Sequence, residues 1–313
     1  SDPISTTGVQ ILENSGIEVV NLQKAKKVGL KKTIQQIDGI IVRSGTIVDQ
    51  ELMKTAKNLQ VIARAGVGID NIDVTYATRK GIVVINTPDV NTISAAEHTI
   101  ALLLALSRNL HIAHDKLING QWGRHDLIGT ELKNKIIGVI GLGKIGREVI
   151  TRCKSFGMKI IGYDPYVNDE NFEKEEIEIL DLDSVIKSAD YITLHIPLNG
   201  STKNLFNHSN LKKMKPTARI INVARGGIIN EADLAKVLND STIAGAAVDV
   251  FSTEPLEDNN PLLSAKNILL SPHLGASTSE AKEGVSKLIC EQVRDYLNDG
   301  KLSNVLNMPI QNA

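Results

Sequence analysis

The sequence predicts an α/β protein built on parallel sheets, because short β-rich runs alternate with helical stretches along nearly the whole chain. The chain has 313 residues, which exceeds the usual size of one hydrophobic core and suggests two domains of roughly 150 residues each. Its composition is 42% hydrophobic, 23% charged and 3% aromatic, as in a globular protein rather than a disordered or fibrous one. We therefore expect two parallel-sheet domains.

The N-terminal part of the chain carries the first series of predicted strands. Three β-rich runs occupy residues 39–43, 61–64 and 82–85. After them comes an apolar helical stretch, which we expect to run from about Ser94 to Arg108 because Ser94 opens an S-x-x-E capping box. The many apolar residues of this helix imply that it is buried.

A second and more regular series of strands follows. Near-continuous apolar runs of this kind are typical of parallel sheets that helices cover on both faces, so we interpret residues 91–271 as one doubly wound domain. A final helix is expected from about Ser277 to Asn298, with a capping pattern at its start and Gly300 at its end. The predicted strands are 136–140, 159–163, 191–195, 219–223, 242–248 and 267–270.

Charge and composition argue against several classes of partner. The chain has 35 basic and 36 acidic residues, a formal net charge of −1, so no overall field attracts nucleic acid. No apolar run approaches the roughly 18 residues of a membrane span, and no secretory signal opens the sequence, so no membrane partner is expected. Cys153 and Cys290 stand outside any CxxC or Cys/His cluster. We therefore expect no disulfide, no metal site and a cytoplasmic location.

A glycine-rich turn follows the predicted strand at residues 136–140. From Gly141 to Gly146 the sequence reads GLGKIG, which matches GxGxxG and precedes a helical stretch at 147–156. In a Rossmann-like unit, Gly141 would form the tight turn, Gly143 would let the backbone approach a pyrophosphate, and Gly146 would let helix and strand pack closely. The motif by itself is equally compatible with a glycine turn that binds nothing.

Asp164 favours the dinucleotide interpretation. It ends the next predicted strand, 18 residues after Gly146 and 23 after Gly141. An acid in this place can accept hydrogen bonds from the adenosine ribose and would repel a 2′-phosphate, and no Arg or Lys occurs from Tyr163 to Glu173 to bind one. An isolated aspartate at a strand end is usually a helix cap. Its spacing from the glycines here predicts NAD as the cofactor.

The later strands end in segments that carry the groups needed for hydride transfer. Oxidation of a secondary alcohol beside a carboxylate requires a base, a cation for the carboxylate and the developing alkoxide, and a hydride acceptor. Arg225 is the expected cation, His273 the acid/base, and Glu254 the acid that holds an imidazolium. The carboxyl ends of the strands border the ligand crevice of a doubly wound sheet, so we expect these three side chains to act there.

Each of these residues also has an ordinary structural interpretation. Arg225 could be a solvated arginine, although the glycines that follow it imply a constrained turn that would aim it. Glu254 could be a surface acid before a proline, and His273 a satisfied buried histidine. The three together are much less expected by chance than each one separately.

The remaining histidines carry less weight. His195 ends a predicted strand and is kept as a lesser candidate that could line the cofactor crevice without chemistry. His98 lies in the apolar helix and is interpreted as packing. Four further histidines are interpreted as peripheral: His111, His114, His125 and His208.

With these segments in this order, the sequence resembles the D-isomer-specific 2-hydroxyacid dehydrogenases over essentially the whole chain. Within that family it is similar to the branch that acts on phosphoglycerate. The motifs that carry the resemblance are VRSGT at 42–46, ARAGVGIDNID at 63–73, NTP at 86–88, AAEHT at 95–99 and SPHLGAST at 271–278. The last of these is the most specific for the phosphoglycerate branch.

The resemblance implies roles for individual residues. It gives Arg225 the substrate carboxylate and carbonyl oxygen, and it pairs His273 with Glu254. It implies that the backbone amides of Gly66, Val67 and Gly68 bind the substrate carboxylate. It places Arg43 and Arg64, with Ser44 beside them, near a distal phosphate of the substrate. It also implies that Arg124 reaches the site of a neighbouring subunit. It implies cofactor contacts at Gly141, Gly143, Lys144, Ile145, Gly146, Asp164, His195, Ile196, Pro197, Val223, Ala224, Arg225, Asp249, His273 and Gly275.

The resemblance also implies a domain plan. Two Rossmann-like or flavodoxin-like domains are expected, with the NAD-binding domain at 91–271 inserted into a substrate-binding domain made of residues 1–90 and 272–313. Members of the family are dimers or larger assemblies, so a homodimer or homotetramer is expected. The first strand of the family pattern is expected before Ser1, and regulatory domains are expected to follow the C-terminal segment in longer members.

Three functions follow as expectations. The first is NAD-dependent oxidation of 3-phospho-D-glycerate to 3-phosphohydroxypyruvate, which opens serine biosynthesis. The second is the dehydrogenation or reduction of another 2-hydroxy acid such as glycerate, glyoxylate or lactate; the formate branch is disfavoured because it has Gln where Glu254 stands. The third is a non-enzymatic, NAD-sensing interaction module on the same fold, which the full Arg/Glu/His set disfavours.

Overall fold

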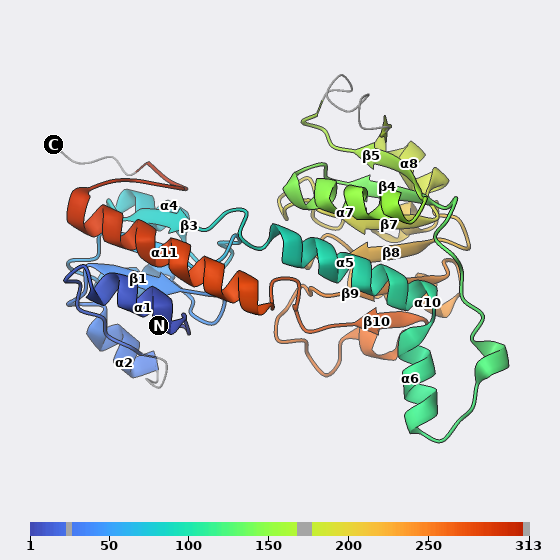
Figure 1. Cartoon of the computed structure of the whole chain (residues 1–313), viewed down its shortest axis with the longest axis horizontal. Coiled ribbons are helices and arrows are strands. Elements are labelled where there is room, and N and C mark those ends of the chain that lie inside the picture. The colour runs from blue at the N-terminus through green and yellow to red at the C-terminus, as the bar shows by residue number, and fades with distance from the viewer. Residues whose placement is uncertain (23–26, 168–176, 309–313) are drawn as a thin grey trace. The chain divides into compact units, whose positions relative to one another are not determined.

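The computed structural model describes residues 1–22, 27–167 and 177–308. The chain forms two compact units (Figure 1). The first unit comprises Ser1–Asn91 and Ala276–Ala313, and the second comprises Thr92–Gly275. The second unit thus ends four residues beyond the predicted boundary at residue 271, because the turn after the last strand of its sheet still packs on that sheet.

The second unit is built on a parallel sheet of seven strands. Their order is β10-β9-β8-β7-β4-β5-β6. The chain first adds β5 and β6 on one side of β4 and then adds β7 to β10 on the other side, so the strand order switches between β4 and β7, as in doubly wound dinucleotide-binding folds. The strands are β4 (Ile136–Ile140), β5 (Lys159–Tyr163), β6 (Glu178–Ile179), β7 (Tyr191–Leu194), β8 (Arg219–Asn222), β9 (Gly245–Val248) and β10 (Ile268–Leu270). The two-residue β6 was not predicted from the sequence.

Helices cover both faces of this sheet. On one face α5 (Thr92–Ser107) and α7 (Lys144–Ser155) pack on each other and on the strands, and α8 (Leu182–Ser188) and α10 (Glu231–Asn239) cover the other (Figure 1). Side chains of each strand alternate between the two cores: Ile220 faces α8 and α10, and Ile221 faces α5. The other helical segments are α6 (Leu110–Ile118), η1 (Arg124–Asp126), α9 (His208–Leu211) and η4 (Pro261–Ser264).

The first unit holds a parallel sheet of three strands among its described residues, in the order β1-β2-β3. The strands are β1 (Gly39–Val42), β2 (Val61–Arg64) and β3 (Val83–Asn86). Helices α1 (Thr6–Glu13) and α11 (Ser279–Asp299) pack together on one face. The other face carries α2 (Lys27–Thr33), α3 (Gln50–Thr55) and α4 (Val74–Arg79).

The predicted helix starts were wrong by a few residues. Helix α5 begins at Thr92, so Ser94 is a buried residue within it and not its cap. Helix α7 begins at Lys144, directly after its N-cap Gly143. Helix α11 is capped by Thr278, whose hydroxyl accepts from the Ala281 amide at 3.1 Å. At its other end Gly300 has φ 66°, the left-handed conformation expected of a glycine that ends a helix.

The described residues contain neither a membrane-spanning helix nor a metal-binding cluster. No helix in the described part of the chain is long and apolar enough to traverse a membrane. Within residues 1–22, 27–167 and 177–308, no cluster of three or more His, Cys, Asp or Glu side chains is placed to hold a metal ion.

Candidate active site

The candidate residues of the second unit lie at one edge of its sheet. Each follows the carboxyl end of a different parallel strand: the glycine turn follows β4, Asp164 follows β5, and His195 follows β7. The three segments that end β8, β9 and β10 carry Val223 to Arg225, Asp249 and His273 to Gly275. In a doubly wound sheet this edge is where ligands bind.

Steric constraints require glycine at two positions of the turn after β4. Gly141 has φ 96°, and a Cβ on it would lie 2.5 Å from the carbonyl oxygen of His195. A Cβ on Gly146 would overlap the carbonyl oxygen of Gly141. A Cβ on Gly143, in contrast, would meet no protein atom within 4 Å. This open space at the start of α7 is what a phosphate approaching the helix N-terminus needs.

Asp164 is tied to the same turn. Its Oδ2 accepts from the amide of Leu142 at 2.9 Å, and its Oδ1 accepts from the amide of Tyr166 at 3.0 Å. The carboxylate is therefore held beside the glycine turn, at the place expected for the ribose-binding acid. The prediction that no cation follows Asp164 as far as Glu173 falls partly on residues 168–173, which lie outside the described residues.

His195 is a partly buried, neutral histidine. Burial lowers its pKa to about 3. One ring nitrogen lies 2.9 Å from the hydroxyl of Thr193, and the carbonyl of His195 crowds Gly141. These contacts make it part of the wall behind the turn.

Arg225 sits in a constrained turn after β8. The amide of the buried Asn222 bridges this turn: its nitrogen donates to the carbonyl of Arg225 at 2.9 Å, and its oxygen accepts from the Ala224 amide at 3.0 Å. The Arg225 guanidinium donates to the Ala224 carbonyl at 2.7 Å. A Cβ on Gly226 would overlap the backbone of Phe251, so Gly226 brings this turn against the segment that carries Glu254.

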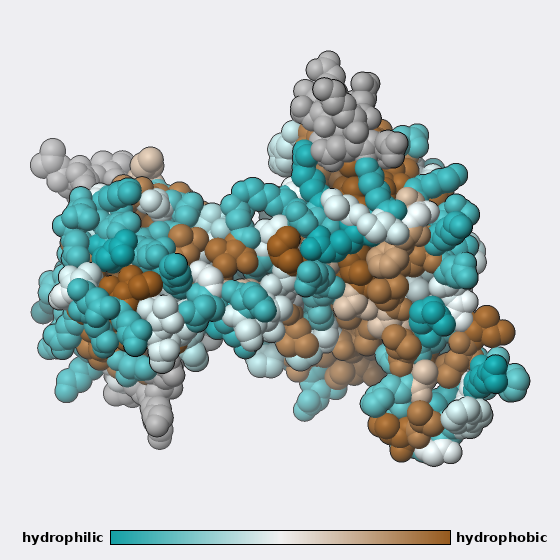
Figure 2. All heavy atoms as spheres, in the orientation of Figure 1, coloured by the Kyte–Doolittle hydropathy of each residue, from teal (hydrophilic) through white to brown (hydrophobic). Residues whose placement is uncertain are grey.

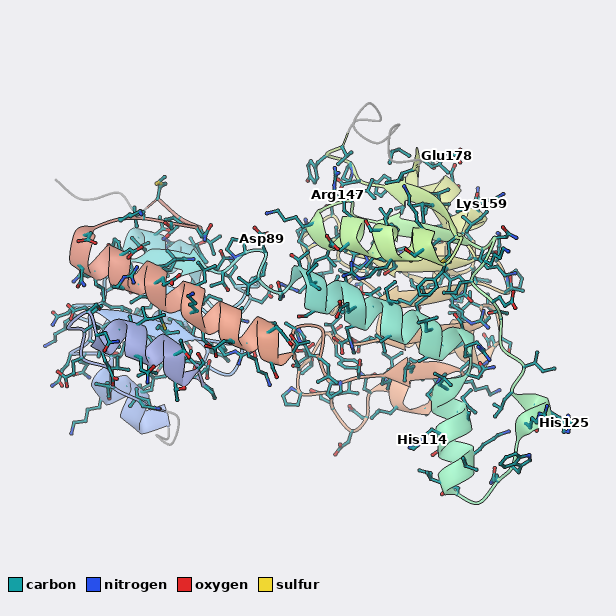
Figure 3. The ribbon with its side chains drawn as sticks, viewed as in Figure 1. Asp89, His114, His125, Arg147, Lys159 and Glu178 are labelled. Carbon is teal, nitrogen blue, oxygen red and sulfur yellow. The ribbon has the colours of Figure 1, made fainter. Side chains whose placement is uncertain are left out.

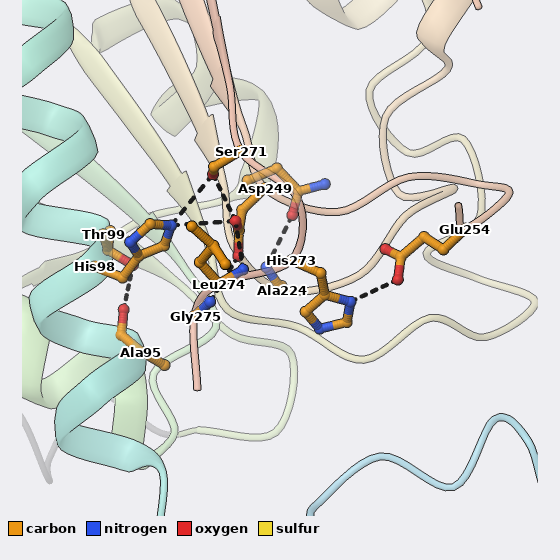
Figure 4. Close-up of polar contacts among 11 residues, drawn as sticks. Ala95, His98, Thr99, Ala224, Asp249, Glu254, Ser271, His273, Leu274 and Gly275 are labelled. Carbon is orange, nitrogen blue, oxygen red and sulfur yellow. Dashed lines mark hydrogen bonds and ion pairs between the residues drawn. The ribbon is translucent and has the colours of Figure 1, made fainter. Parts of the chain in front are cut away.

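Glu254 and His273 form a close pair (Figure 4). His273 Nδ1 lies 2.6 Å from Glu254 Oε2, and Glu254 Oε1 accepts from the Phe251 amide at 3.0 Å. The hydrogen bond to Glu254 raises the pKa of His273 above its ordinary value, against burial and the charge of Arg225. Burial raises the pKa of Glu254, but hydrogen bonds from His273 and Phe251 outweigh it and leave that pKa lowered. With 47% of its side chain exposed, His273 is accessible to a small molecule.

These groups can hold and move one proton. An imidazole bonded through Nδ1 to a carboxylate has its other nitrogen available for a hydroxyl or a carbonyl oxygen. The charge of Arg225 acts on this imidazole, so an oxyanion that develops there has a cation close by. The arrangement is one that proton transfer coupled to hydride transfer requires.

The residues expected to bind substrate lie in the first unit, apart from Arg124 and Arg225. Val42 pairs with Arg64 across β1 and β2, so Arg43 and Arg64 leave the same edge of that sheet. Arg43 is held at both ends of its backbone, since its amide donates to Asp2 at 2.6 Å and its carbonyl accepts from Asn71 at 2.7 Å. Ser44 is exposed beside it.

The glycine-containing loop after β2 follows Arg64 directly. The Arg64 guanidinium donates to the Ala65 carbonyl at 2.8 Å, and a Cβ on Gly66, which has φ 148°, would lie 2.6 Å from that guanidinium. The carbonyl of Gly66 accepts from Thr87, and that of Val67 accepts from Asn86. Val67 is exposed and Gly68 is half-buried.

The remaining predicted residues occupy several places. Lys144 and Ile145 open α7, and Ile196 and Pro197 follow β7. Arg124 is exposed on η1, in the arm that α6 and the following loop form. Figure 3 shows His114 and His125 on that same arm, where both are exposed.

Sequence reasoning missed three contributors in the second unit. Asn222 and Ser271 stand within segments that were singled out, but neither was assigned a role. His98 was assigned to packing, yet its Nε2 lies 3.1 Å from Asp249 Oδ1. The signal in each case was a polar residue in an otherwise apolar strand or helix, which indicates a buried hydrogen bond.

A cavity of about 630 Å³ lies elsewhere, in the first unit along β1 and against α1 and α11. Its described lining includes Val9, Leu12 and Val293 and none of the expected substrate-binding residues. We therefore do not assign it to the candidate site.

The fold and the site define a dinucleotide-binding domain of the type found in dehydrogenases. Residues 100–275 match the family model of the D-isomer specific 2-hydroxyacid dehydrogenase NAD-binding domain. The chain belongs to the D-isomer-specific 2-hydroxyacid dehydrogenases.

Known relatives agree with this assignment. The chain is 44% identical over 310 residues to D-3-phosphoglycerate dehydrogenase of Methanocaldococcus jannaschii and 42% identical over 307 residues to the human protein of that name. These matches cover 99% and 98% of this chain but 59% and 57% of the relatives, so the chain spans a little over half their length. NAD-dependent formate dehydrogenase of Staphylococcus aureus, solved with NAD, superposes with a TM-score of 0.87 at 28% identity, covering 97% of this chain and 92% of that one.

Proposed function

We propose that this chain catalyses the NAD-dependent oxidation of 3-phospho-D-glycerate to 3-phosphohydroxypyruvate, the first step of serine biosynthesis. The observation that carries the proposal is the 2.6 Å pair between His273 and Glu254, on which the charge of Arg225 acts. The relatives named D-3-phosphoglycerate dehydrogenase support the choice of substrate.

The residues around the glycine turn fit NAD. The open space at Gly143 suits a pyrophosphate, and the Asp164 carboxylate suits a ribose that carries no 2′-phosphate. We propose that Lys144 and Ile145 bind through their backbone amides, and that Ile196, Pro197, Val223, Ala224 and Gly275 complete the cofactor contacts. Bound NAD supplies the hydride acceptor.

Side chains of the protein itself carry out the proton transfer in the proposed reaction. In the proposed oxidation, neutral His273 accepts the hydroxyl proton at Nε2, while the Glu254 carboxylate bonded to Nδ1 stabilises the imidazolium that forms. Arg225 binds the substrate carboxylate and the oxygen that becomes the carbonyl. In the reverse direction, the imidazolium returns the proton.

The phosphate of the substrate is proposed to be bound by Arg43 and Arg64. Arg64 ends β2 and Arg43 follows β1 at the same edge of the first unit's sheet, and an arginine pair suits a phosphate better than a neutral hydroxy acid. The backbone amides of Gly66, Val67 and Gly68 are proposed to bind the substrate carboxylate, with Ser44 and Arg124 as further contacts.

A panel of hydroxy acids tests this substrate assignment. We expect NADH formation with 3-phosphoglycerate, and Arg43→Ala is expected to lower kcat/KM for that substrate by about 10- to 100-fold, as for loss of a charged hydrogen bond, with little change for D-glycerate or D-lactate. Arg79→Ala, at an exposed arginine on α4, is the matched control. Equal losses on all substrates, or none on 3-phosphoglycerate, would contradict the phosphate assignment.

Glu254→Gln is expected to move the pH profile of oxidation. Oxidation needs neutral His273, so kcat/KM rises with pH through the pKa of that imidazole. Glu254 raises this pKa, and its removal therefore shifts the midpoint to lower pH while kcat falls by about 10- to 100-fold through loss of orientation. Initial rates between pH 5 and pH 10 measure both changes. An unmoved midpoint would mean that the pair does not control the proton.

Two other functions remain as alternatives with distinct outcomes. Activity on glyoxylate, glycerate or lactate without activity on 3-phosphoglycerate would identify a dehydrogenase of another hydroxy acid. NAD binding without turnover of any hydroxy acid would favour the NAD-sensing module. The exposed His273–Glu254 pair supports an enzyme over that module.

We further propose a homodimer or homotetramer. Leu117, Ile118, Trp122 and Ile128 on the α6 arm are 58%, 67%, 81% and 84% exposed, and Figure 2 shows brown atoms over α6. Such clustering is typical of a surface that a partner covers. The double variant Ile118→Ser/Trp122→Ser should sediment as a smaller species than the wild type. The control is Met308→Ser, because Met308 lies in the first unit and is 82% exposed. This control should sediment as the wild type does. An unchanged assembly would remove this arm from the interface.

A cytoplasmic location is also proposed, supported by Cys153 and Cys290, which are both free and buried. Burial raises the pKa of each thiol to about 12, which makes them unreactive. Fractionation of cells that make the protein would test the location.

A further inference from the structure

The carboxylate of Asp249, in the second unit, is fully buried. Its side chain is 0% exposed, and it accepts hydrogen bonds from the Ser271 hydroxyl at 2.5 Å and from the amides of Leu274 and Gly275 at 2.8 and 2.9 Å (Figure 4). Burial raises the pKa of Asp249, but hydrogen bonds from His98, Ser271 and Leu274 outweigh it and leave that pKa lowered. The carboxylate is therefore an anion stabilised by hydrogen-bond donors of the protein.

One partner of Asp249 comes from a different part of the fold. His98 lies on α5, and its Nε2 is 3.1 Å from Asp249 Oδ1 and 3.3 Å from the Ser271 hydroxyl. The other donors belong to the segment of residues 271–275 that follows β10. Asp249 thus links α5 to that segment.

The same segment carries His273 in an unfavourable backbone conformation. His273 has φ 54°, in the left-handed region that is unfavourable for a residue with a Cβ. Its amide donates to the Asp249 carbonyl at 2.8 Å, and the two amides after it donate to the Asp249 carboxylate. The turn keeps this conformation because Asp249 binds it through backbone and side chain together.

We propose that His98 is a positioning residue that, through Asp249, holds the 271–275 turn and so orients the His273 imidazole toward Glu254. This inference rests on the proposed function, in which His273 moves the proton. His273 is then held in two ways. Glu254 bonds its imidazole ring, and Asp249, itself bonded to His98, binds the backbone around it.

Charged groups around Asp249 decide how a His98 variant responds to pH. Those that act on the network are His98 from α5, His273 within the turn, Glu254 after β9 and Arg225 after β8. Without the His98 hydrogen bond, burial raises the pKa of Asp249 with less opposition. The carboxylate then takes up a proton at a higher pH than in the wild type, and the turn loses an acceptor.

His98→Leu, His98→Gln and the control Thr99→Val form the test. Leucine removes the donor, whereas the glutamine amide can donate from a position similar to Nε2. Thr99 is the neighbouring buried residue on α5, and its hydroxyl donates to the Ala95 carbonyl at 2.8 Å within the same helix. For His98→Leu we expect kcat to fall by about 10- to 100-fold with KM for NAD nearly unchanged, and kcat/KM to decline on the acid side at a higher pH than in the wild type. Glutamine should restore most of both properties, and Thr99→Val should match the wild type.

Hydrogen exchange provides a readout that does not depend on activity. In His98→Leu the amides of Leu274 and Gly275 should exchange faster at neutral pH, while the strands keep wild-type protection. Wild-type kcat, pH profile and exchange in His98→Leu would overturn the proposal, as would uniform loss of protection with unchanged kcat, because that result describes a purely structural histidine. If the wild type turns over no hydroxy acid, the proposed function fails, and the exchange rates of the turn still decide whether His98 holds it.

Discussion

Replacing His273 with alanine is expected to lower kcat for hydroxy-acid oxidation by about 10² to 10⁴-fold, the usual contribution of a positioned acid/base. The physical reason is that His273 is the imidazole bonded to Glu254 at 2.6 Å with an accessible side chain. Binding of NAD should change little, because the glycine turn and Asp164 are untouched. Stopped-flow absorbance of NADH at saturating substrate measures the chemical step.

The control for His273 is His114→Ala, at an exposed histidine on α6. It should retain wild-type kcat. If His273→Ala also retained it, the proton would have to be taken by another group, and the mechanism proposed for this site would be wrong. Loss of activity with loss of NAD binding would instead indicate that the 271–275 turn had moved as a whole.

Gly146→Ala should weaken NAD binding by about 10- to 100-fold. Its new Cβ would overlap the carbonyl oxygen of Gly141, so the start of α7 has to move away from the turn. Overpacking of this kind costs about 1 to 3 kcal/mol, and the displaced helix N-terminus no longer presents its amides to the pyrophosphate. Isothermal titration with NAD measures the affinity.

Gly200→Ala is the matched control for this substitution. A Cβ there would meet no atom within 4 Å, and the residue lies in an exposed loop of the same unit. We expect wild-type affinity from it. Wild-type affinity in Gly146→Ala as well would show that the helix can shift at no cost to binding, and would remove the steric reason for this glycine.

Much of the sheet could be predicted from local sequence. Apolar runs bounded by polar residues identified β4, β5, β7 and β8 because each strand is long enough, and buried enough on both faces, to leave a continuous pattern. The pattern failed for β6, which has two residues and an exposed start. It also failed for the start of α5, because the capping box at Ser94 competes with burial of that serine inside a longer helix.

The pairing of His273 with Glu254 was expected from chemistry and resemblance, and the structure brings them to 2.6 Å. The environment of Asp249 was not foreseen. Its partner His98 precedes it by 151 residues and looks, in the sequence, like one polar residue on an apolar helix. Local pattern cannot distinguish a histidine that packs from one that bonds a buried carboxylate.

The sequence by itself determined the α/β class, the strand ends that carry the glycine turn, Asp164, Arg225 and His273, and the choice of NAD, because these depend on spacing within short segments. Only the tertiary structure decided that the Asp249 carboxylate is closed off by four donors and that His98 is one of them. Such contacts join strands and helices far apart in the chain, and their geometry arises only when the sheet has assembled. The residues of the proposed hydride-transfer site can therefore be recognised in the sequence, whereas the contacts around Asp249 cannot.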